Sequence, residues 1–361
     1  MIVVSYSAAV APPTSPARVV RAAAPIRVAD AGGWTDTWFA RFGAVFNIAV
    51  GPCAEVAIAV WPAGSGRAPV VVHAADFGDR YAPRLDGAGW ERHPLLEAAI
   101  ASCPPPAGVA VEVTVSCAVP PGAGTGTSAA VTVALVGALA RVAGRNLAPD
   151  EAARAAHAVE VERLGQQSGV QDQIASACGG INLIEIDDYP HSTRRRLDVP
   201  ETLLRELARR LVLVSLGRAH RSSDLHERVI ARLTGSGPAC DELQALRQAA
   251  RQAAQAAEAG RLDHLGRALV ANTEAQRQLH PDLVGRDATR VIELARVYGA
   301  AGWKVNGAGG DGGSLTILAP ADADAREAMI RAVLRAGPGY RLVPISLDQD
   351  GLRVWDEQDG P

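Results

Sequence analysis

A glycine-rich segment at residues 120–130, with the sequence PPGAGTGTSAA, constrains this chain more than any other feature. It follows the alternating apolar run VAVEVTVSCAV, which is typical of a strand, and precedes an Ala/Val/Leu-rich run typical of a buried helix. Alternate glycines let a backbone approach a ligand without a Cβ clash, and the N–H groups at a helix start attract anions. The pattern therefore predicts a phosphate site, for which a nucleoside triphosphate is the natural ligand.

The hydroxyls of Thr127 and Ser128 would bond a phosphate oxygen or Mg²⁺, which prefers hard oxygen donors. The segment has neither the Walker A pattern nor a dinucleotide-binding fingerprint. A plain glycine-rich turn followed by a Thr or Ser helix cap remains an alternative.

A second glycine-rich run, KVNGAGGDGG at residues 304–313, leads directly into the apolar stretch SLTIL. Two such loops in one chain favour a ligand site over coincidence, although a wide hairpin or bulge is the alternative for this run. Lys304 is the only lysine in the chain. It would add positive charge at this loop or lie on the exposed surface.

Three carboxylates follow the first glycine loop along the chain. Asp172 is the best candidate for a base, because phosphoryl transfer needs a carboxylate to take or orient the proton of the attacking hydroxyl. Glu160 and Glu162 end a predicted helix over 149–164, and either would hold a metal. They lie at similar angles to its apolar stripe, so periodicity does not choose between them, and a solvated role is the alternative for each.

The segment DAGGWTDT at residues 30–37 predicts a tight turn that presents Trp34, Thr35 and Asp36 together. An aspartate accepts two sugar hydroxyls at once, and an aromatic face packs on the C–H side of a pyranose. The turn therefore favours a polyol ligand, with a core tryptophan in an Asx-type turn as the alternative.

The order of elements predicts an α+β chain of two domains. We expect a loose tail at residues 1–16, an N-terminal domain over 17–200 and a C-terminal domain over 201–361. The boundary follows DDYPHSTRRR, which we interpret as a loop. The other predicted elements are the following: strands at 45–50, 54–60, 70–74, 109–119, 211–216, 314–318 and 341–347, and helices at 94–102, within 119–143, 149–164, two within 240–278, 287–301 and 321–336.

Composition excludes several classes of protein. The 39 acidic and 36 basic residues leave a formal charge of −3, so no basic field would hold nucleic acid or an anionic membrane. No apolar run approaches the roughly 18 residues that span a bilayer. The five cysteines include no Cys-x-x-Cys, so neither a disulfide set nor a zinc site is indicated, and a reducing cytoplasm fits best. We expect a monomer or homodimer.

Read together, three motifs resemble those of the GHMP kinase superfamily, and the resemblance spans about residues 18–318. The motifs occur in family order: APIRVADAGGWTDT, PPGAGTGTSAA and GWKVNGAGGDGGSLTIL. The stretch EVERLGQQSGVQDQIASACGGINLIEI is similar to the subgroup of D-glycero-D-manno-heptose 7-phosphate kinases, and GGWTDT is similar to the kinase part of L-fucokinase. The implied fold has a ribosomal protein S5 domain 2-like N-terminal domain and a ferredoxin-like C-terminal domain.

The resemblance also implies roles for individual residues. Asp172 would be the catalytic carboxylate, with Arg27 near the reacting hydroxyl. Ser128 and Glu162 would bind Mg²⁺, with Glu160 in reserve. The ATP phosphates would be wrapped by these residues: Pro121, Gly122, Ala123, Gly124, Thr125, Gly126, Thr127 and Ser128. The substrate would contact these residues: Trp34, Thr35, Asp36, Asp172, Gly309 and Gly310.

The implied activity is transfer of the γ-phosphoryl group of ATP to a sugar or sugar phosphate, with the anomeric hydroxyl of D-glycero-D-manno-heptose 7-phosphate as the first candidate. Arg218, His220 and Arg221 would receive the phosphate already on that sugar, or form a surface loop. Three alternatives remain: a fucose-, arabinose- or galactose-type kinase, a non-catalytic sugar and ATP sensor, and a diphosphomevalonate decarboxylase-like enzyme.

Overall fold

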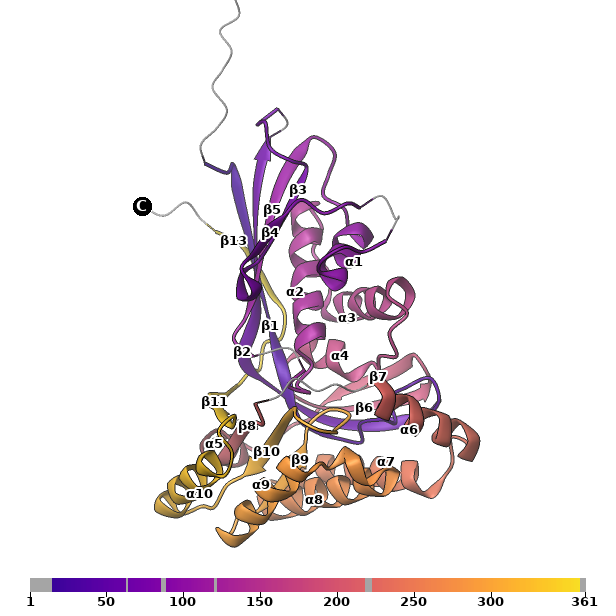
Figure 1. Ribbon diagram of the computed structural model, residues 1–361, viewed down its shortest axis with the longest axis vertical. Helices are drawn as coiled ribbons and strands as arrows, with labels where there is room; N and C mark the ends of the chain where they lie inside the picture. The colour runs from indigo at the N-terminus through magenta and orange to yellow at the C-terminus, as the bar shows by residue number, and fades with distance from the viewer. Residues whose placement is uncertain (1–14, 63, 86–88, 120–121, 218–222, 358–361) are drawn as a thin grey trace, which may run out of the picture.

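A computed structural model describes residues 15–62, 64–85, 89–119, 122–217 and 223–357 (Figure 1). Its strands are β1 (Arg18–Ala31), β2 (Gly43–Pro62), β3 (Val70–Ala74), β4 (Asp79–Tyr81), β5 (Val109–Cys117), β6 (Ile181–Asp188), β7 (His191–Arg196), β8 (Leu211–Ser215), β9 (Gly302–Val305), β10 (Ser314–Leu318), β11 (Arg341–Val343), β12 (Ser346–Leu347) and β13 (Arg353–Asp356). Its α-helices are α1 (Pro94–Ser102), α2 (Thr127–Val142), α3 (Pro149–Ala158), α4 (Gln171–Cys178), α5 (Glu201–Arg210), α6 (Ser223–Ser236), α7 (Asp241–Glu258), α8 (Leu262–Leu279), α9 (Arg286–Val297) and α10 (Ala323–Ala336).

The larger sheet has the strand order β13-β1-β2-β5-β3-β4, and the hairpin β6–β7 extends it beside β2. The two strands expected at 45–50 and 54–60 are parts of the single long strand β2, because β1 pairs with both halves across an irregularity at Pro25 and Ile26. The first half of β2 also pairs with β6 and the second half with β5. Strand β2 thus joins two regions of the sheet. The two glycine loops contact β1 just beyond the irregularity, at Arg27 and Asp30.

The interpretation of DDYPHSTRRR as a loop is wrong. Residues 191–196 form β7, which pairs antiparallel with β6 across a short turn at Tyr189 and Pro190. All side chains of β7 are polar, and most of them are exposed. A strand at the edge of a sheet buries little, so it lacks the apolar alternation that identifies a strand in a sequence.

The smaller sheet is antiparallel, with the order β11-β8-β10-β9, and residues of α9 and α10 close one side of its hydrophobic cluster. The strand expected at 341–347 divides into β11, which joins this sheet, and β12, which pairs with β2 in the larger one. The prediction of an α+β chain is confirmed, with its helices packed on two sheets.

The predicted buried helix after the first glycine loop is confirmed as α2, in which nearly every residue is buried. It packs on β1 and β2, with α3 and α4 beside it. The largest hydrophobic cluster combines these elements with residues of α7 and α8, such as Ala250 and Leu265. The domain boundary near residue 200 stays a prediction.

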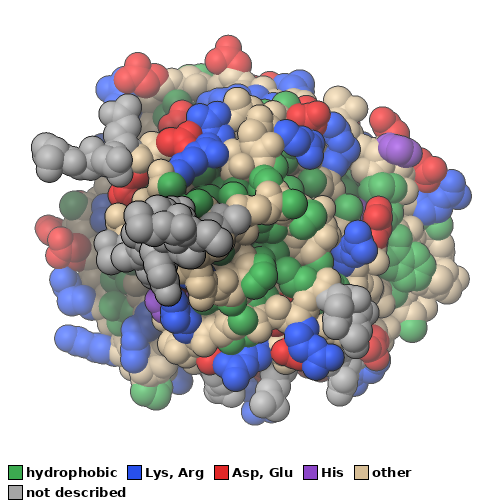
Figure 2. Space-filling view, turned by 90° about the horizontal axis from the view of Figure 1, so that it is seen from above, with side chains coloured by type: hydrophobic (Ala, Val, Ile, Leu, Met, Phe, Trp, Pro, Cys, Tyr) green, Lys and Arg blue, Asp and Glu red, His purple; other side chains and the backbone are tan. Residues whose placement is uncertain are grey.

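No helix in the described ranges is long and apolar enough to cross a bilayer. The five cysteines are free thiols. Figure 2 shows the end of the molecule at the top of Figure 1, where acidic and basic side chains are interspersed around a central group of hydrophobic ones. This face therefore presents no extended basic field.

Arg247 of α7 is a buried cation that holds the chain segment leading from the Trp34 turn into β2. Its guanidinium donates to the carbonyls of Ala40, Phe42 and Pro238 at 2.7–3.3 Å and lies 4.0 Å from the centre of the Phe42 ring. Burial lowers the pKa of Arg247 to about 10. Hydrogen bonds to these carbonyls offset the cost of burying the guanidinium.

We expect Arg247→Met to lower the free energy of unfolding by about 3 kcal/mol, since several buried carbonyls would lose a charged donor. Urea unfolding measures the change. The matched control is Arg251→Met, one turn along α7, whose exposed pair with Glu185 should contribute about 0.5 kcal/mol or less. Equal midpoints for the two variants would contradict the assigned role.

Candidate active site

Two cavities meet between the glycine loops. The first, of about 490 Å³, runs from the start of α2 to α1, and we call it the loop cavity. The second, of about 470 Å³, lies beside the turn at Trp34, and we call it the Trp34 cavity. Both are lined by the following five residues: Arg27, Asp172, His226, Gly307 and Ala308. A group bound in one cavity would therefore reach a group bound in the other at Asp172 and Arg27.

The first glycine loop adopts backbone conformations that favour glycine. Gly122, Gly124 and Gly126 have φ values of 78°, 72° and 69°. A Cβ on Gly124 would lie 2.8 Å from the carbonyl oxygen of Asn306, so only glycine lets the two loops pass this closely. Within the described part of the chain, no side chain caps the first turn of α2, which leaves its N–H groups for a ligand.

The structure brings most of the predicted phosphate-binding residues to the loop cavity. Those that line it are Gly122, Gly124, Gly126, Thr127 and Ser128. Ala123 and Thr125 are buried behind it, where their backbone carbonyls accept hydrogen bonds from Ser314 and from the Arg27 N–H. Pro121 lies outside the described residues.

Asp172 stands in the first turn of α4, where the two cavities join. Its carboxylate receives the Arg27 Nε at 2.8 Å and Nη2 at 3.2 Å, a bidentate pair. Its side chain is 26% exposed, so one side of the carboxylate remains open to the cavities. This is the geometry that a proton acceptor for a bound hydroxyl requires.

Arg27 is buried at the junction and bonds to more than Asp172. Its Nη1 donates to the carbonyl of Gly124 and lies 3.5 Å from the carboxylate of Asp30. Burial disfavours the charged form, but the fields of Asp172 and Asp30 outweigh burial and raise the pKa of Arg27 above its ordinary value. The guanidinium is therefore a fixed cation between the phosphate loop and the candidate base.

The turn at residues 32–37 presents two of its three predicted substrate residues. Trp34 lines the Trp34 cavity, with its Nε1 donating to the carbonyl of Ala308 at 3.2 Å. Asp36 lines it too and is 2% exposed, and its carboxylate accepts the N–H of Gln171 at 3.1 Å. Thr35 is fully buried, and its hydroxyl donates to the carbonyl of Gly32 at 2.7 Å. Thr35 thus shapes the turn from behind.

Asp36 has an unusually high pKa for a carboxyl group. Burial raises its pKa to about 6, and the nearby charge of Asp172 adds to the rise. The hydrogen bond from the N–H of Gln171 acts in the opposite direction and lowers the pKa. At neutral pH the side chain is an ionised acceptor in a site that compensates its charge poorly. Hydroxyl donors from a ligand would improve that compensation.

In the second glycine loop, the predicted substrate residues Gly309 and Gly310 line neither cavity. Gly307 and Ala308 line both cavities. Gly309 and Gly310 lie behind them against the chain at residues 283–284, where a Cβ on Gly309 would meet the carbonyl oxygen of Leu283 at 2.2 Å. The two predicted glycines therefore position the cavity floor, and residues 307–308 form its surface.

Glu160 and Glu162 lie in a π-helical turn, Val159–Arg163, that continues α3. Glu162 is exposed. Glu160 is 3% exposed, and its Oε2 accepts from Ser168 at 2.7 Å and Gln173 at 2.9 Å. Burial raises the pKa of Glu160 to about 7, and the charge of Asp172 contributes to the rise. The structure thus places Glu160 within the electrostatic field of the candidate base.

A magnesium ion is implied by the family resemblance, and the donor set fits one. Ser128 offers a hydroxyl in the loop cavity, and the buried Oε1 of Glu160 has no hydrogen-bond partner among the described residues. The described residues contain no group of three or more His, Cys, Asp or Glu side chains that would hold a metal by themselves. A site of few protein ligands completed by phosphate oxygens and water is the usual arrangement for Mg²⁺.

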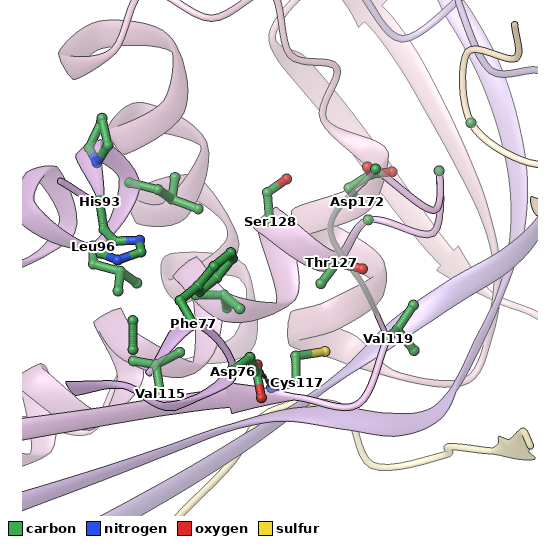
Figure 3. Close-up of a pocket in the computed structure, with 18 of the residues that line it drawn as sticks. Asp76, Phe77, His93, Leu96, Val115, Cys117, Val119, Thr127, Ser128 and Asp172 are labelled. Atoms are coloured by element: carbon green, nitrogen blue, oxygen red, sulfur yellow. Dashed lines mark hydrogen bonds between the residues drawn. The ribbon is translucent and has the colours of Figure 1, made fainter. Parts of the chain in front are cut away.

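Several cavity residues have no motif that would have revealed them. His226 of α6 lines both cavities and packs edge-on against Trp34, with ring centres 5.1 Å apart. Figure 3 shows Phe77 and His93 at one end of the loop cavity and Thr127, Ser128 and Asp172 at the other. The apolar end, lined also by Leu96 and other aliphatic side chains, would suit a nucleobase. Such scattered residues meet only in the folded chain.

Two further predictions concern Lys304 and a group of basic residues after β8. The alternative of an exposed Lys304 is wrong, since that side chain is 1% exposed beneath the second glycine loop. Arg218, His220 and Arg221 lie outside the described residues.

Comparison with known proteins gives the site its context. Residues 95–180 match the family model described as GHMP kinases N terminal domain. A mevalonate kinase of Thermococcus onnurineus is 29% identical over 251 residues, covering 68% of this chain and 70% of its own. The D-glycero-alpha-D-manno-heptose 7-phosphate kinase of Campylobacter jejuni is 26% identical over 237 residues, covering 66% and 68%.

A crystal structure of a D-glycero-D-manno-heptose 1-phosphate kinase from Bacteroides thetaiotaomicron has the same fold, with a TM-score of 0.70 at 21% identity over 94% of this chain and 100% of that one. The chain therefore belongs to the GHMP kinase superfamily and is an ATP-dependent phosphotransferase that acts on an alcohol group.

Proposed function

We propose that this kinase phosphorylates a sugar or sugar phosphate, with the anomeric hydroxyl of D-glycero-D-manno-heptose 7-phosphate as the first candidate. The observation that carries the proposal is the Trp34 cavity, where an indole and the buried carboxylate of Asp36 lie beside Asp172. A polyol offers C–H faces to the indole and hydroxyl donors to the carboxylate.

The arrangement supports a direct transfer. The triphosphate of ATP would lie along the loop at residues 122–128, with its phosphate oxygens against the N–H groups at the start of α2. Asp172 would accept the proton of the sugar hydroxyl. The hydroxyl oxygen would then bond to the γ-phosphorus while the bond from the γ-phosphorus to the ADP oxygen breaks. Arg27 would stabilise the charge that develops between them.

We propose that Ser128 is one magnesium ligand and that a glutamate of the π-helical turn is the other. The unpartnered Oε1 and the burial of Glu160 support Glu160, whereas the family pattern of a glutamate before Arg163 supports Glu162. The ion would supply neutralisation of the negative charge shared by the β- and γ-phosphate oxygens.

Mevalonate is the second candidate acceptor, since a mevalonate kinase is among the relatives. The described lining of the Trp34 cavity favours hydroxyl groups over anionic groups. Asp36, Asp172 and Glu227 are acidic, and Arg27 is already paired with Asp172. An anionic group would meet repulsion there, so the carboxylate of mevalonate and the 7-phosphate of the heptose would each have to bind away from these acids, whereas neutral hydroxyls would find acceptors.

A coupled assay of ADP release tests the proposal with heptose 7-phosphate, fucose, arabinose, galactose and mevalonate as acceptors. We expect the highest kcat/KM with the heptose phosphate. A free hexose or pentose as the best acceptor would favour the fucose- or galactose-type alternative. Turnover of mevalonate alone would overturn the sugar assignment. Binding of ATP and sugar without turnover would indicate a sensor.

We expect Asp36→Ala to raise the sugar KM about 10- to 100-fold, because a charge-assisted hydrogen bond to a hydroxyl contributes about 1.5–3 kcal/mol. The KM for ATP is the internal control and should stay nearly constant. In the wild type the sugar KM should also rise as the pH falls below the Asp36 pKa of about 6, since protonation removes the acceptor. A pH-independent sugar KM between pH 5 and 8 would argue against contact with Asp36.

A further inference from the structure

Lys304 is a buried cation directly beneath the cavity floor. It stands on β9, two residues before Asn306 and the floor loop, and is 1% exposed. Its Nζ donates to the Gln276 side chain of α8 at 3.2 Å and to the carbonyl of Val305, and lies 3.8 Å from the carboxylate of Asp30 on β1. Burying an ammonium group is costly unless its charge is compensated. The compensating charge is Asp30.

Asp30 is the common partner of the floor loop and of two cations. Its carboxylate is fully buried and accepts the N–H of Gly307 at 3.0–3.1 Å. It also lies 3.5 Å from Arg27 and 3.8 Å from Lys304. One carboxylate therefore connects the lysine, the floor of both cavities and the guanidinium that holds the candidate base.

The charges of the cluster formed by Arg27, Asp30, Asp172 and Lys304 sum to zero only with the lysine present. Arg27 lies between two carboxylates, at 2.8 Å from Asp172 and 3.5 Å from Asp30. Lys304 supplies the second positive charge, so that two cations face two anions. Without it, Asp30 would draw the guanidinium away from Asp172, because Arg27 would be the remaining cation of the cluster.

We propose that Lys304 is a positioning residue for phosphoryl transfer: it neutralises Asp30, and so leaves Arg27 free to hold Asp172 and keeps the floor at Gly307 in place. The inference rests on the proposed role of Asp172 as the base. Lys304 is buried beneath the floor and does not line either cavity. It acts through Asp30 and Arg27.

The protonation of Lys304 gives the proposal a second readout. Burial lowers its pKa to about 8, Asp30 opposes the fall and Arg27 adds to it. Among the described side chains, Asp30 and Arg27 on β1 are the charged groups that act on the ammonium, and the neutral amide of Gln276 on α8 accepts a hydrogen bond from it. Loss of this proton has the same consequence for Asp30 as removal of the lysine. We therefore expect kcat to fall as the pH rises through about 8.

The central experiment compares Lys304→Met with the double variant Asp30→Asn/Lys304→Met. We expect Lys304→Met to lower kcat ~10²-fold, since misplacement of catalytic groups by about 1 Å has effects of this size, with little change in the KM for ATP. The double variant should recover at least ~10-fold of the loss, because the uncompensated carboxylate is gone and the asparagine still accepts from Gly307. A lysine that served only to fill space would show no such recovery.

Two further variants keep the test decisive if Lys304→Met folds poorly. Lys304→Arg should retain activity and move the alkaline fall in kcat to higher pH, because arginine keeps its proton. The matched control is Arg210→Met. This substitution removes a half-buried cation at the end of α5, which donates to the carbonyl of Ala319 just after β10. It should leave kcat and its pH profile unchanged.

The outcomes separate this inference from the proposed function. A Lys304→Met variant with wild-type kcat, or a double variant no more active than the single one, would overturn the positioning role. If Asp172→Asn is inactive in the same assay, the proposed function still stands. Full activity in Asp172→Asn would instead overturn the proposed function. An alkaline fall in kcat that is identical in the wild type and Lys304→Arg would also contradict the assignment to Lys304.

Discussion

Asp172→Asn is expected to lower kcat at least ~10²-fold, because the amide cannot accept the proton of the attacking hydroxyl. The backbone N–H groups at residues 122–128 are untouched, so affinity for ATP should stay nearly constant. Single-turnover kinetics and a nucleotide-binding titration on the same preparation measure the two effects.

Asp187→Asn is the matched control, since it removes an exposed acid at the end of β6. It should leave both quantities unchanged. Equal kcat in Asp172→Asn and the wild type would show that the proton goes elsewhere. A parallel loss of ATP affinity would show that Asp172 serves the nucleotide instead of the acceptor hydroxyl.

Arg27→Met should combine a loss of activity with a loss of stability. The buried carboxylate of Asp30 and the carboxylate of Asp172 would lose a shared partner, and removal of one member of a buried ion pair costs about 3–5 kcal/mol. We expect a fall of about 3 kcal/mol in the free energy of unfolding, together with a loss of ~10²-fold or more in kcat as transition-state charge loses a donor.

Urea unfolding and steady-state kinetics measure these changes. Arg21→Met, on the same strand, removes an exposed pair with Glu357 and should change stability by about 0.5 kcal/mol or less. Arg27→Lys should recover part of the stability but less of the activity, since a lysine cannot form the bidentate pair with Asp172. An Arg27→Met variant as stable and active as Arg21→Met would refute the assignment.

The parts of the site that local chemistry determines could be predicted from the sequence. Strand, glycine loop and buried helix follow one another at residues 109–142, and the loop has the positive φ values that its glycines suggest. Trp34 and Asp36 line the Trp34 cavity, and the sequence of the turn at residues 30–37 predicts that both are presented to a ligand. In each case the information lies within a few neighbouring residues.

The parts that depend on packing between distant segments could not be predicted. Thr35 and Gly309 belong to the right motifs, but which residue of a turn faces a cavity depends on the segments behind it, at Gly32 and Leu283. The burial of Lys304 depends on Asp30, far away in the sequence. His226 contacts Trp34 only because α6 packs against the turn at residues 32–37.

The most direct test of the central claim is a crystal structure with Mg²⁺, a non-hydrolysable ATP analogue and the best acceptor sugar. We expect phosphate oxygens within hydrogen-bond distance of the N–H groups at the start of α2, and a sugar hydroxyl within about 3 Å of the Asp172 carboxylate in the Trp34 cavity. A triphosphate bound away from residues 122–128, or an acceptor hydroxyl facing away from Asp172, would contradict the claim.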